Sequence, residues 1–498
     1  MGDYKLSKHI DPNKIFIVNR SEIEGRWDAE FYNPEINAWE KKVRALSSKK
    51  LRNFINYISS GATPSVKEEE RFYSDKETGI PFLRVQNLQT NGKIALNDVK
   101  YINTDTHENY LKRSQVGEHD LLVKITGVGR MAIASVAPDG FIGNTNQHMV
   151  VIRTDNKNTS EYLAKYLNLD IVEKLASRRS TGGTRPALDY PALKSIPIIE
   201  GLDFSPIQKA EKIKQQKEAR AAVLLAGIDD YLLGELGITL PKQDNSLQNR
   251  IFTTQFSEVV GGRLDPKLYD NYTTNLKKAI LSFKNPNFRI DKLSNYIIHS
   301  VSGNWGEENI QDSFVKCLVI RATEFDNEYN LNLDNSKVKY RFIEKVKLKK
   351  LDVKENDLLI EKSGGSPDQP VGRIAIITKD ILNNNTIGFS NFIHKIKINS
   401  NLLKPEYLFC YLKTIHNIKL TESMQSQTNG IRNLIMYEYL NQNIVFPIRY
   451  DGKPDVEKQN EIAKHIQDIR TQAKQLQQEA QQLLEQAKKE VEQMILGE

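Results

Sequence analysis

The 498-residue sequence contains the same long pattern of residues twice. The first copy opens with Ile15-Phe16, Ser21-Glu22 and Gly25-Arg26-Trp27-Asp28, and the second opens with Ile251-Phe252, Ser257-Glu258 and Gly262-Arg263-Leu264-Asp265. In both copies a tyrosine follows four residues after the aspartate, at Tyr32 and Tyr269. Because a pattern that returns in order indicates a structural unit used more than once, the chain is predicted to contain two related domains.

Further matches follow in the same order through both copies. Lys50-Leu51, Asn53 and Ser60-Gly61 match Lys292-Leu293, Asn295 and Ser302-Gly303; Val116 and Asp120-Leu121-Leu122 match Val353 and Asp357-Leu358-Leu359; Gly129-Arg130 match Gly372-Arg373; Glu161-Tyr162-Leu163 match Glu406-Tyr407-Leu408; Gly183 and Arg185 match Gly430 and Arg432; Pro197-Ile198 match Pro447-Ile448. Before Gly372 this alignment gives the second copy a six-residue insertion with Pro367 and Pro370. The whole unit is therefore duplicated, with small differences in its loops.

Each copy has the pattern of a mixed α/β domain of roughly 180 residues. In the first copy, residues 120–125, 131–136 and 149–153 have β-strand character, and residues 160–175 have helical periodicity. Asp28 and Asp265 are predicted to cap an opening helix in each copy, because aspartate favours the N-cap and Pro266 suits the first helical position. Similar frameworks with different loops suggest one scaffold that presents two surfaces. A duplication kept only for stability is the alternative.

Each copy is followed by a predicted long helix. The last, about 456–496, has apolar or small residues in steps of four and three, as in a coiled coil with one departure near its end. They are Ile462, Ile466, Ile469, Ala473, Leu476, Ala480, Leu483, Ala487, Val491 and Met494. The central helix, about 206–236, has a weaker seam through Ile207, Ala210, Ile213, Ala221, Leu224, Ile228 and Tyr231, interrupted by Lys214 and Lys217.

The two helices are expected to pair antiparallel, because equivalent helices related by a pseudo-two-fold axis run in opposite directions. Roughly 30 to 40 helical residues span ~45 to 60 Å, more than one ~34 Å turn of duplex DNA. The pair could therefore set a distance between the domains. A homodimerisation coiled coil is the alternative that this seam leaves open.

These patterns predict an α/β fold with two duplicated mixed α/β domains separated by a long antiparallel coiled-coil helix pair. The predicted bounds are 1–204 for the first domain, 205–240 for the central helix, 241–454 for the second domain and 455–498 for the C-terminal helix.

Composition limits the function. Hydrophobic residues make up 39% of the chain and charged residues 27%, and neither an apolar run of membrane length nor a signal-peptide pattern is present, which favours a cytoplasmic location. Cys317 and Cys410 are the only cysteines, so a disulfide framework and a cysteine zinc motif are excluded. The eight histidines lack metal-ligand spacing, and no metal is expected.

The positive charge lies outside the helices. Residues 456–498 have 6 Lys and Arg against 8 Asp and Glu, a net −2, and residues 207–236 have 5 against 5. Since the chain has net charge +7, the remainder has +9. A basic surface on the two domains suits phosphate binding, although a solubilising excess of lysine would look the same.

Enzymatic motifs are missing from the sequence. Gly92-Lys93 and Gly452-Lys453 are followed by Ile94 and Pro454, so neither is a phosphate-binding loop. Gly127-Val128-Gly129 leads into further strand pattern and not a dinucleotide-binding helix, and Asn33-Pro34 and Asn285-Pro286 lack the rest of an amino-methyltransferase loop. The chain is therefore predicted to be non-catalytic.

Glycine-rich loops with arginines are the candidate contacts for nucleic acid, because glycine allows close backbone approach and arginine binds phosphate or guanine. In the first copy the predicted DNA-binding residues are Arg84, Gln86, Asn87, Lys124, Arg130, Arg179 and Arg185; in the second copy they are Arg321, Lys362, Arg373 and Arg432. The same pattern is also usual in ordinary turns. Lys345 to Lys350 could be a phosphate-binding row or an exposed strand face.

Two α/β units that begin near GR-x-D segments and end in Ile196-Pro197 or Phe446-Pro447 before a long helix resemble the specificity subunits of type I restriction-modification systems. The segments Asp229-Asp230-Tyr231-Leu232-Leu233 and Glu235-Leu236-Gly237 are similar to segments of such subunits. One departure is the glutamate-glutamine pair expected where each helix starts, which residues 455–461 approximate and residues 205–211 meet less well.

The resemblance implies two target-recognition domains that each read half of a split, asymmetric double-stranded DNA site, as part of phage defence. It implies as partners two methylation subunits, which use S-adenosylmethionine to methylate adenine N6, and up to two restriction subunits that use ATP and Mg. No cofactor is expected in this chain. A stand-alone DNA-binding or scaffold protein that dimerises through its helices is the main alternative, and a fragment of a fused methylation enzyme is a third.

Overall fold

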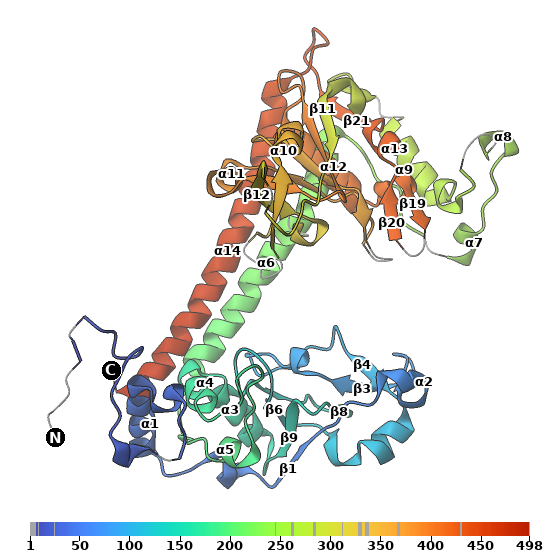
Figure 1. Ribbon diagram of the computed structural model, residues 1–498. Coiled ribbons are helices and arrows are strands. Elements are labelled where there is room, and N and C mark those ends of the chain that lie inside the picture. Colours follow the sequence, from blue (N-terminus) through green and yellow to red (C-terminus); the bar gives the residue numbers. More distant parts are fainter. Residues whose placement is uncertain are drawn as a thin grey trace. The chain divides into compact units, whose positions relative to one another are not determined.

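The computed structural model (Figure 1) describes residues 6–7, 9–23, 25–244, 246–259, 263–281, 285–310, 312–326, 331–333, 338–365, 369–428 and 431–497. The chain divides into two compact units, which are described separately. The first unit comprises Met1–Gln215 with Glu479–Glu498, and the second comprises Gln216–Gln478. Within the described ranges, no helix has the length and apolarity needed to cross a membrane.

The first unit is built on two small sheets. Its strands are β1 (Tyr57–Ser60), β2 (Tyr73–Ser74), β3 (Ile80–Leu83), β4 (Lys100–Ile102), β5 (Gln115–Val116), β6 (Leu121–Lys124), β7 (Ala134–Val136), β8 (Gly143–Thr145) and β9 (Met149–Arg153). Its helices are α1 (Pro34–Leu46), α2 (Glu69–Phe72), α3 (Lys157–Leu167), α4 (Asp170–Ser177) and α5 (Tyr190–Lys194), joined by the start of α6 (Ser205–Leu236) and the end of α14 (Val456–Leu496).

The antiparallel sheet β1-β9-β6-β7 forms the centre of the first unit. All four residues of β6 are buried, as expected for a strand that has a neighbour on each side and is covered on both faces. One face packs with α3 and α4 in a core that also includes Ile207 and Val491 from the long helices. The second sheet, β2-β4-β3-β8-β5, contains one parallel pair, β3 with β8.

The second unit has the following elements. Its strands are β10 (Phe288–Lys292), β11 (Ile297–Ser302), β12 (Phe314–Ile320), β13 (Lys339–Glu344), β14 (Leu358–Glu361), β15 (Ser363–Gly364), β16 (Ile374–Ile376), β17 (Ile387–Phe389), β18 (Ile393–Ile398), β19 (Gln425–Thr428), β20 (Ile431–Leu434) and β21 (Asn443–Pro447). Its helices are α7 (Leu247–Arg250), α8 (Phe256–Val259), α9 (Asn271–Leu281), α10 (Lys345–Leu351), α11 (Lys379–Asn384), α12 (Pro405–Asn417) and α13 (Met436–Leu440), with the end of α6 and the start of α14.

The central sheet of the second unit, β11-β18-β14-β16, has the strand order of the first unit's central sheet. The registers also agree. Leu121 pairs with Ile152 and Val136 in the first unit, and Leu358 pairs with Ile396 and Ile376 in the second. In each unit a parallel pair belongs to a further sheet, β3 with β8 and β12 with β17. Matched positions of the two copies, paired in the same register, therefore build both central sheets.

A matched glycine allows the two sheets of each unit to approach closely. A Cβ atom on Gly61 would lie 1.7 Å from the carbonyl oxygen of Thr145, and one on Gly303 would lie 2.1 Å from the carbonyl oxygen of Ser390. Both distances are shorter than any real contact, and both involve backbone that cannot rotate away. The repeated Ser-Gly pair is therefore required by packing.

The repeated Asp120 and Asp357 also have a structural role. Each carboxylate accepts the backbone N–H that lies three residues earlier, on Gly117 and Lys354, at 2.9 Å. Asp357 also binds the Lys395 ammonium at 2.7 Å, and both side chains are fully buried. Burial of a charge without its partner costs several kcal/mol, so the turn before β14 depends on this pair.

The opening segments of both copies differ from the prediction. Asp28 and Asp265 begin 3-10 turns, Ala29–Tyr32 and Pro266–Leu268, and the first full helices begin later, at Pro34 and Asn271. Asp265 does cap its turn, but the Asp28 side chain binds Arg26 instead. The lysine-rich segment at 345 forms helix α10, because its alternation was too short to fix the period. This excludes the exposed strand face, whereas the phosphate-binding row stays untested.

The long helices lie where the sequence predicts them, with a shifted seam. In α14, Leu484 and Ile495 are buried, whereas the expected Leu483 is half-buried and Met494 is 47% exposed. In α6, Ile213 is 40% exposed, whereas Lys214 and Lys217 are half-buried. Lysine stems can cover apolar surface while their ammonium groups reach water, so these lysines occupy seam positions that we expected them to interrupt.

Gly61→Ala is expected to prevent stable folding of the first unit, because the new methyl group overlaps the Thr145 backbone and forces the sheets apart, at roughly 3 kcal/mol or more. Gly183→Ala is the matched control, since a Cβ there meets no atom within 4 Å. Urea unfolding monitored by circular dichroism gives the comparison. Equal midpoints for the two variants would contradict the packing argument.

Candidate nucleic-acid interface

The turn after β6 contains two of the predicted DNA-binding residues, Lys124 and Arg130. Gly127 and Gly129 have φ angles of +121° and +80°, which a residue with a side chain rarely adopts. The Lys124 side chain is buried and its ammonium donates to the carbonyl oxygen of Val128 at 2.8 Å. Burial lowers the pKa of Lys124, against the opposing charge of Glu173. Lys124 therefore fixes the turn from the buried side, through the Val128 carbonyl oxygen.

Arg130 is also engaged within the protein. Its guanidinium binds the Asp170 carboxylate and the Asn168 carbonyl oxygen, at the start of α4. Glu492 of α14 accepts the backbone N–H groups of Asp170 and Ile171 at the same helix end. Arg130 therefore joins the turn to α4, and its predicted role as a DNA contact stays untested.

The second glycine-rich loop, 178–185, divides into a buried and an exposed part. Arg178 and Arg179 bind the Glu40 carboxylate of α1 at 3.0 and 2.5 Å, and all three side chains are less than 10% exposed. Burial alone would raise the pKa of Glu40, but Arg179 and Arg178 outweigh it and hold that pKa below its usual value. Arg185, by contrast, is exposed.

This loop and the turn after β6 lie side by side. The Gly127 N–H donates to the Pro186 carbonyl oxygen at 3.0 Å, and Thr126 forms a β-bridge with Ala187. Segments 124–130 and 178–187 together contain five cationic residues and neither aspartate nor glutamate. The half-buried and exposed residues of this joined surface, from Thr126 to Arg130 and from Thr181 to Arg185, form the first unit's candidate interface.

The third predicted group, Arg84, Gln86 and Asn87, follows β3. Asn87 is 1% exposed, accepts the Arg84 N–H at 2.8 Å, and donates to the carbonyl oxygens of Ala95 and Asp98. Its amide is therefore fully used inside the protein. The Arg84 and Gln86 side chains both bind the exposed Asp98 carboxylate.

The second unit repeats this arrangement with different charges. The Arg321 N–H and guanidinium both bind Glu324, which is fully buried and stands where the first unit has Asn87. Arg373 binds the buried Glu361 carboxylate at 2.8 Å and the carbonyl oxygens of Ala322 and Phe325. Arg321 and Arg373 therefore hold the framework, whereas Lys362 and Arg432 are half-buried.

Three of the sequence matches are shifted in the structure. The Ala132 N–H donates to the Lys124 carbonyl oxygen, and the Gly372 N–H donates to the Glu361 carbonyl oxygen. Because Lys124 and Glu361 are equivalent positions, Arg373 corresponds to Ile133 and not to Arg130. This shortens the insertion in the second copy from six residues to three. Pro367 lies outside the described residues. The Leu188 N–H donates to the Ile125 carbonyl oxygen, and the Leu434 N–H donates to the Lys362 carbonyl oxygen. Leu188 and Leu434 are therefore equivalent positions.

The same hydrogen bonds align Arg185 with Ile431, and Arg432 with Pro186. Lys50 pairs with Pro197 as Lys292 pairs with Asn443, so Pro447 is not the counterpart of Pro197. Because neighbouring strand residues point to opposite faces, a shift by one residue changes which side chain is presented. Gly262, Asn429 and Gly430, which belong to the sequence matches, lie outside the described residues.

The sequence reading missed the segment before β9. The His148 carbonyl oxygen accepts the N–H groups of Ile125 and Thr126, so Gln147 and His148 lie beside the turn after β6. Gln147 is exposed and hydrogen-bonds to Thr63 of the loop after β1. Phe392 occupies the place of His148 in the second unit and is 51% exposed. Only a structural alignment of the two copies reveals this pair, because the residue types differ.

The matched arginines of the GR-x-D segments tie the start of each unit to these loops. Arg26 donates to the carbonyl oxygens of Arg179 and Ser180, and Arg263 donates to those of Ser423 and Gln425. Each arginine also binds the aspartate two residues on. The matched tyrosines complete the arrangement, since Tyr32 and Tyr269 donate to the Arg26 and Arg263 carbonyl oxygens at 3.0 and 2.8 Å.

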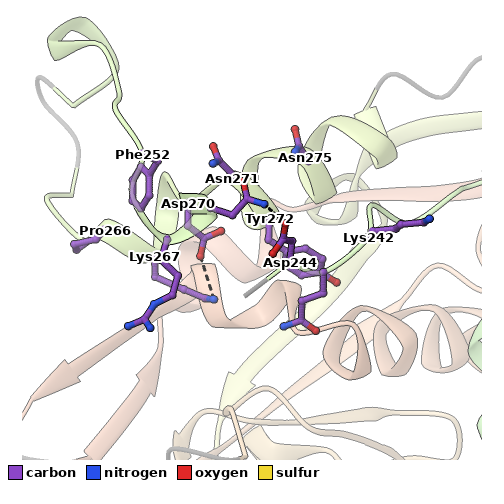
Figure 2. Close-up of a pocket in the computed structure, with 12 residues that line it drawn as sticks. Lys242, Asp244, Phe252, Pro266, Lys267, Asp270, Asn271, Tyr272 and Asn275 are labelled. Atoms are coloured by element: carbon purple, nitrogen blue, oxygen red, sulfur yellow. Dashed lines mark hydrogen bonds and ion pairs between the residues drawn. The ribbon is translucent and has the colours of Figure 1, made fainter. Parts of the chain in front are cut away.

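A cavity of about 520 Å³ in the second unit lies between residues 242–252 and the start of α9 (Figure 2). Lys267 lines it and binds Asp270 at 3.1 Å and Glu422 at 3.3 Å, so its charge is used within the wall. Among the described residues no group of three or more histidine, cysteine or acidic side chains could hold a metal ion.

The first unit's framework, including the turn after β6 and the 178–185 loop, matches a known family. Residues 46–199 match the type I restriction modification DNA specificity domain. The resemblance drawn from the sequence is thereby confirmed for this segment. A search of curated proteins found no match.

Among solved structures, this chain is similar to a chain from a study of complex assembly and conformational transition of the type I R-M system, with 14% identity and a TM-score of 0.40. The similarity covers 90% of this chain and 95% of that chain. It is also similar to the type I restriction-modification S subunit from M. genitalium, with 12% identity, TM-score 0.34, and coverage of 89% and 95%. It is similar as well to the HsdS subunit from Thermoanaerobacter tengcongensis, with 14% identity and a TM-score of 0.29. That similarity covers 90% of this chain and 94% of that chain.

Glu40→Gln is expected to destabilise the first unit by roughly 3 to 5 kcal/mol at pH 7, because it leaves two buried guanidinium groups without a carboxylate. The pKa of Glu40 is lowered in the fold, so its contribution is fully present above the unfolded pKa of about 4.3 and is lost as pH falls through the folded pKa. The difference between variant and wild type should therefore shrink at acidic pH.

The measurement is urea unfolding followed by fluorescence of Trp39, which neighbours Glu40, in a background with Trp27 and Trp305 changed to Phe. Glu35→Gln is the control, because this exposed carboxylate lies on the same helix and its loss should cost within about 0.5 kcal/mol. Equal stability of the Glu40→Gln variant and wild type at pH 7 would contradict the role of this cluster.

Proposed function

We propose that this chain is the sequence-specific DNA recognition subunit of a type I restriction-modification complex, and that it reads a bipartite, asymmetric site. The match of residues 46–199 to the DNA specificity domain carries this proposal. The candidate interface of the first unit lies inside the matched segment. Its glycine-rich turns include the exposed Arg185 and Arg130, whose guanidinium binds the Asp170 carboxylate. Such a surface suits a phosphate backbone beside base edges.

The second unit is proposed to be a second target-recognition domain. Its central sheet repeats the strand order and register of the first, and the arginine-aspartate clamp and the tyrosine bond to it recur. The loops on this framework differ. Where the first unit has His148 the second has Phe392, and the turn after β14 is three residues longer. Different loops on equal frameworks support two different half-sites.

The helices α6 and α14 are proposed to form an antiparallel coiled coil between the domains. In the first unit Lys214, near the start of α6, donates to Gln481, near the end of α14. In the second unit Glu235, at the end of α6, binds Lys458, at the start of α14, at 3.2 Å, and Tyr231 contacts His465. The opposite pairing of ends in each unit supports the antiparallel arrangement.

Methylation and cleavage are assigned to partner chains. The sequence lacks a phosphate-binding loop and an amino-methyltransferase loop, so methylation subunits that bind S-adenosylmethionine and restriction subunits that use ATP and Mg would supply this chemistry. Two methylation subunits would fit two recognition domains. The chain itself is proposed to carry no cofactor and to act in the cytoplasm.

Exchange of residues 15–200 for the corresponding segment of another specificity chain tests this division of labour. One half of the methylated site should change and the other half should stay, because each domain reads its own half. The readout is the DNA footprint of the chain purified with its methylation partner. A site that changes in both halves, or a homodimer that binds DNA without a partner chain, would refute the proposal.

Insertion of seven residues into both helices, after Gln215 and before Glu479, tests the spacing role. Seven residues keep the coiled-coil register and add about 10 Å, or about three base pairs of DNA. We expect a spacer about three base pairs longer with unchanged half-sites. Insertion into α14 alone is the control that breaks the pairing. An unchanged spacer in the double insertion would exclude the helices as the determinant of distance.

A further inference from the structure

One apolar side chain stands out on the candidate interface of the first unit. Val128 is 76% exposed, at the tip of the turn after β6. Both of its neighbours are glycines, so Val128 supplies the only side chain at the tip. An isolated exposed valine on a mobile loop would need no explanation, but this turn is held in place.

The turn is held by three independent contacts. The buried Lys124 ammonium binds the Val128 carbonyl oxygen, the Gly127 N–H binds the Pro186 carbonyl oxygen, and Arg130 binds the start of α4. Burial of a lysine ammonium that hydrogen-bonds to one backbone carbonyl costs desolvation free energy, which an ordinary turn would not need. These contacts fix the direction in which the Val128 side chain projects.

The surroundings indicate what the valine meets. Polar or cationic groups lie on the adjoining segments, including Gln147, His148 and the exposed Arg185, and these segments carry no acid between residues 124–130 or 178–187. Cations suit phosphates, and amide and imidazole groups suit base edges. Within a groove of DNA, the apolar feature available to a valine is the 5-methyl group of thymine, which lies in the major groove.

On this basis, and resting on the proposed DNA-reading function, we propose that Val128 is a specificity-determining residue that contacts the methyl group of one thymine in the first unit's half-site. Lys124 acts as a positioning residue, because it touches the turn and not the base. The equivalent turn of the second unit is longer and includes the half-buried Lys362, so the second half-site is read without this valine.

Uracil scanning tests the proposal, since replacing thymine by uracil removes only the methyl group. The probe is duplex DNA containing the methylated site, with one thymine at a time replaced, and the protein is the full chain in complex with its methylation subunits. Wild type should bind about fourfold more weakly when one particular thymine of the first half-site is replaced, the value of one buried methyl group. Val128→Ser should bind thymine and uracil equally at that position and keep its response at every other position.

Val223→Ser is the matched control, because Val223 is 72% exposed and lies on helix α6, outside the candidate interface. This variant should keep the wild-type response to uracil in the first half-site. The proposal is overturned if wild type shows no such position, if Val128→Ser keeps the discrimination, or if Val128→Ser instead fails to assemble with the methylation subunits. In these outcomes site-specific binding by wild type still supports the proposed function. Absence of any site-specific binding overturns both.

Discussion

The candidate interface of the first unit, and the matching loops of the second, depend on one backbone junction at the end of the central strand. The carbonyl oxygen of His148 accepts two N–H groups, from Ile125 at 2.9 Å and Thr126 at 3.3 Å. In the second unit the carbonyl oxygen of Phe392 accepts those of Lys362 at 2.7 Å and Ser363 at 3.3 Å. This junction requires only backbone atoms, so it tolerates any side chain. It fixes where the loops leave the sheet, while the loop residues are free to differ.

The cations of the glycine-rich segments serve two purposes. Arg26, Arg178 and Arg179 in the first unit face inward and join the N-terminal segment, α1 and the loop after α4. Arg185 lies at the exposed end of the same loop. Inward arginines order the loop before any DNA arrives, which lowers the entropy lost on binding. Basic charge in this chain is therefore partly structural, and a count of arginines overstates the binding surface.

The sequence predicted the framework well because local physics determines it. The bounds of β9 and of both long helices, predicted from apolar periodicity and from proline and glycine at the helix ends, agree with the structure to within about one residue. The single helix predicted at 160–175 is instead two helices, α3 and α4. The loops were harder. Arg432 was matched to Arg185 by residue type, but backbone hydrogen bonds align Arg432 with Pro186. Sequence similarity cannot detect a one-residue shift in a loop whose two copies share few side chains.

The candidate site was predicted in part, for the same reason. Glycine and arginine mark loops that the structure brings side by side in the first unit. Burial decides which arginine is exposed, and burial depends on distant partners such as Glu40 and Glu361. Lys124 was predicted as a DNA contact. In the structure its ammonium binds the Val128 carbonyl oxygen, which sequence alone does not reveal, and the predicted contact stays untested. His148 and Phe392 were missed because their matched position exists only in the fold.

Adenine methylation across the genome tests the central claim most directly, namely that one chain holds two different DNA readers on one repeated framework. Methylome sequencing of cells with and without the chain should show one asymmetric motif, split into two halves by an unspecified gap, whose adenine methylation disappears when the chain is removed. An unchanged methylome, or loss of methylation at a continuous or palindromic motif, would contradict the account.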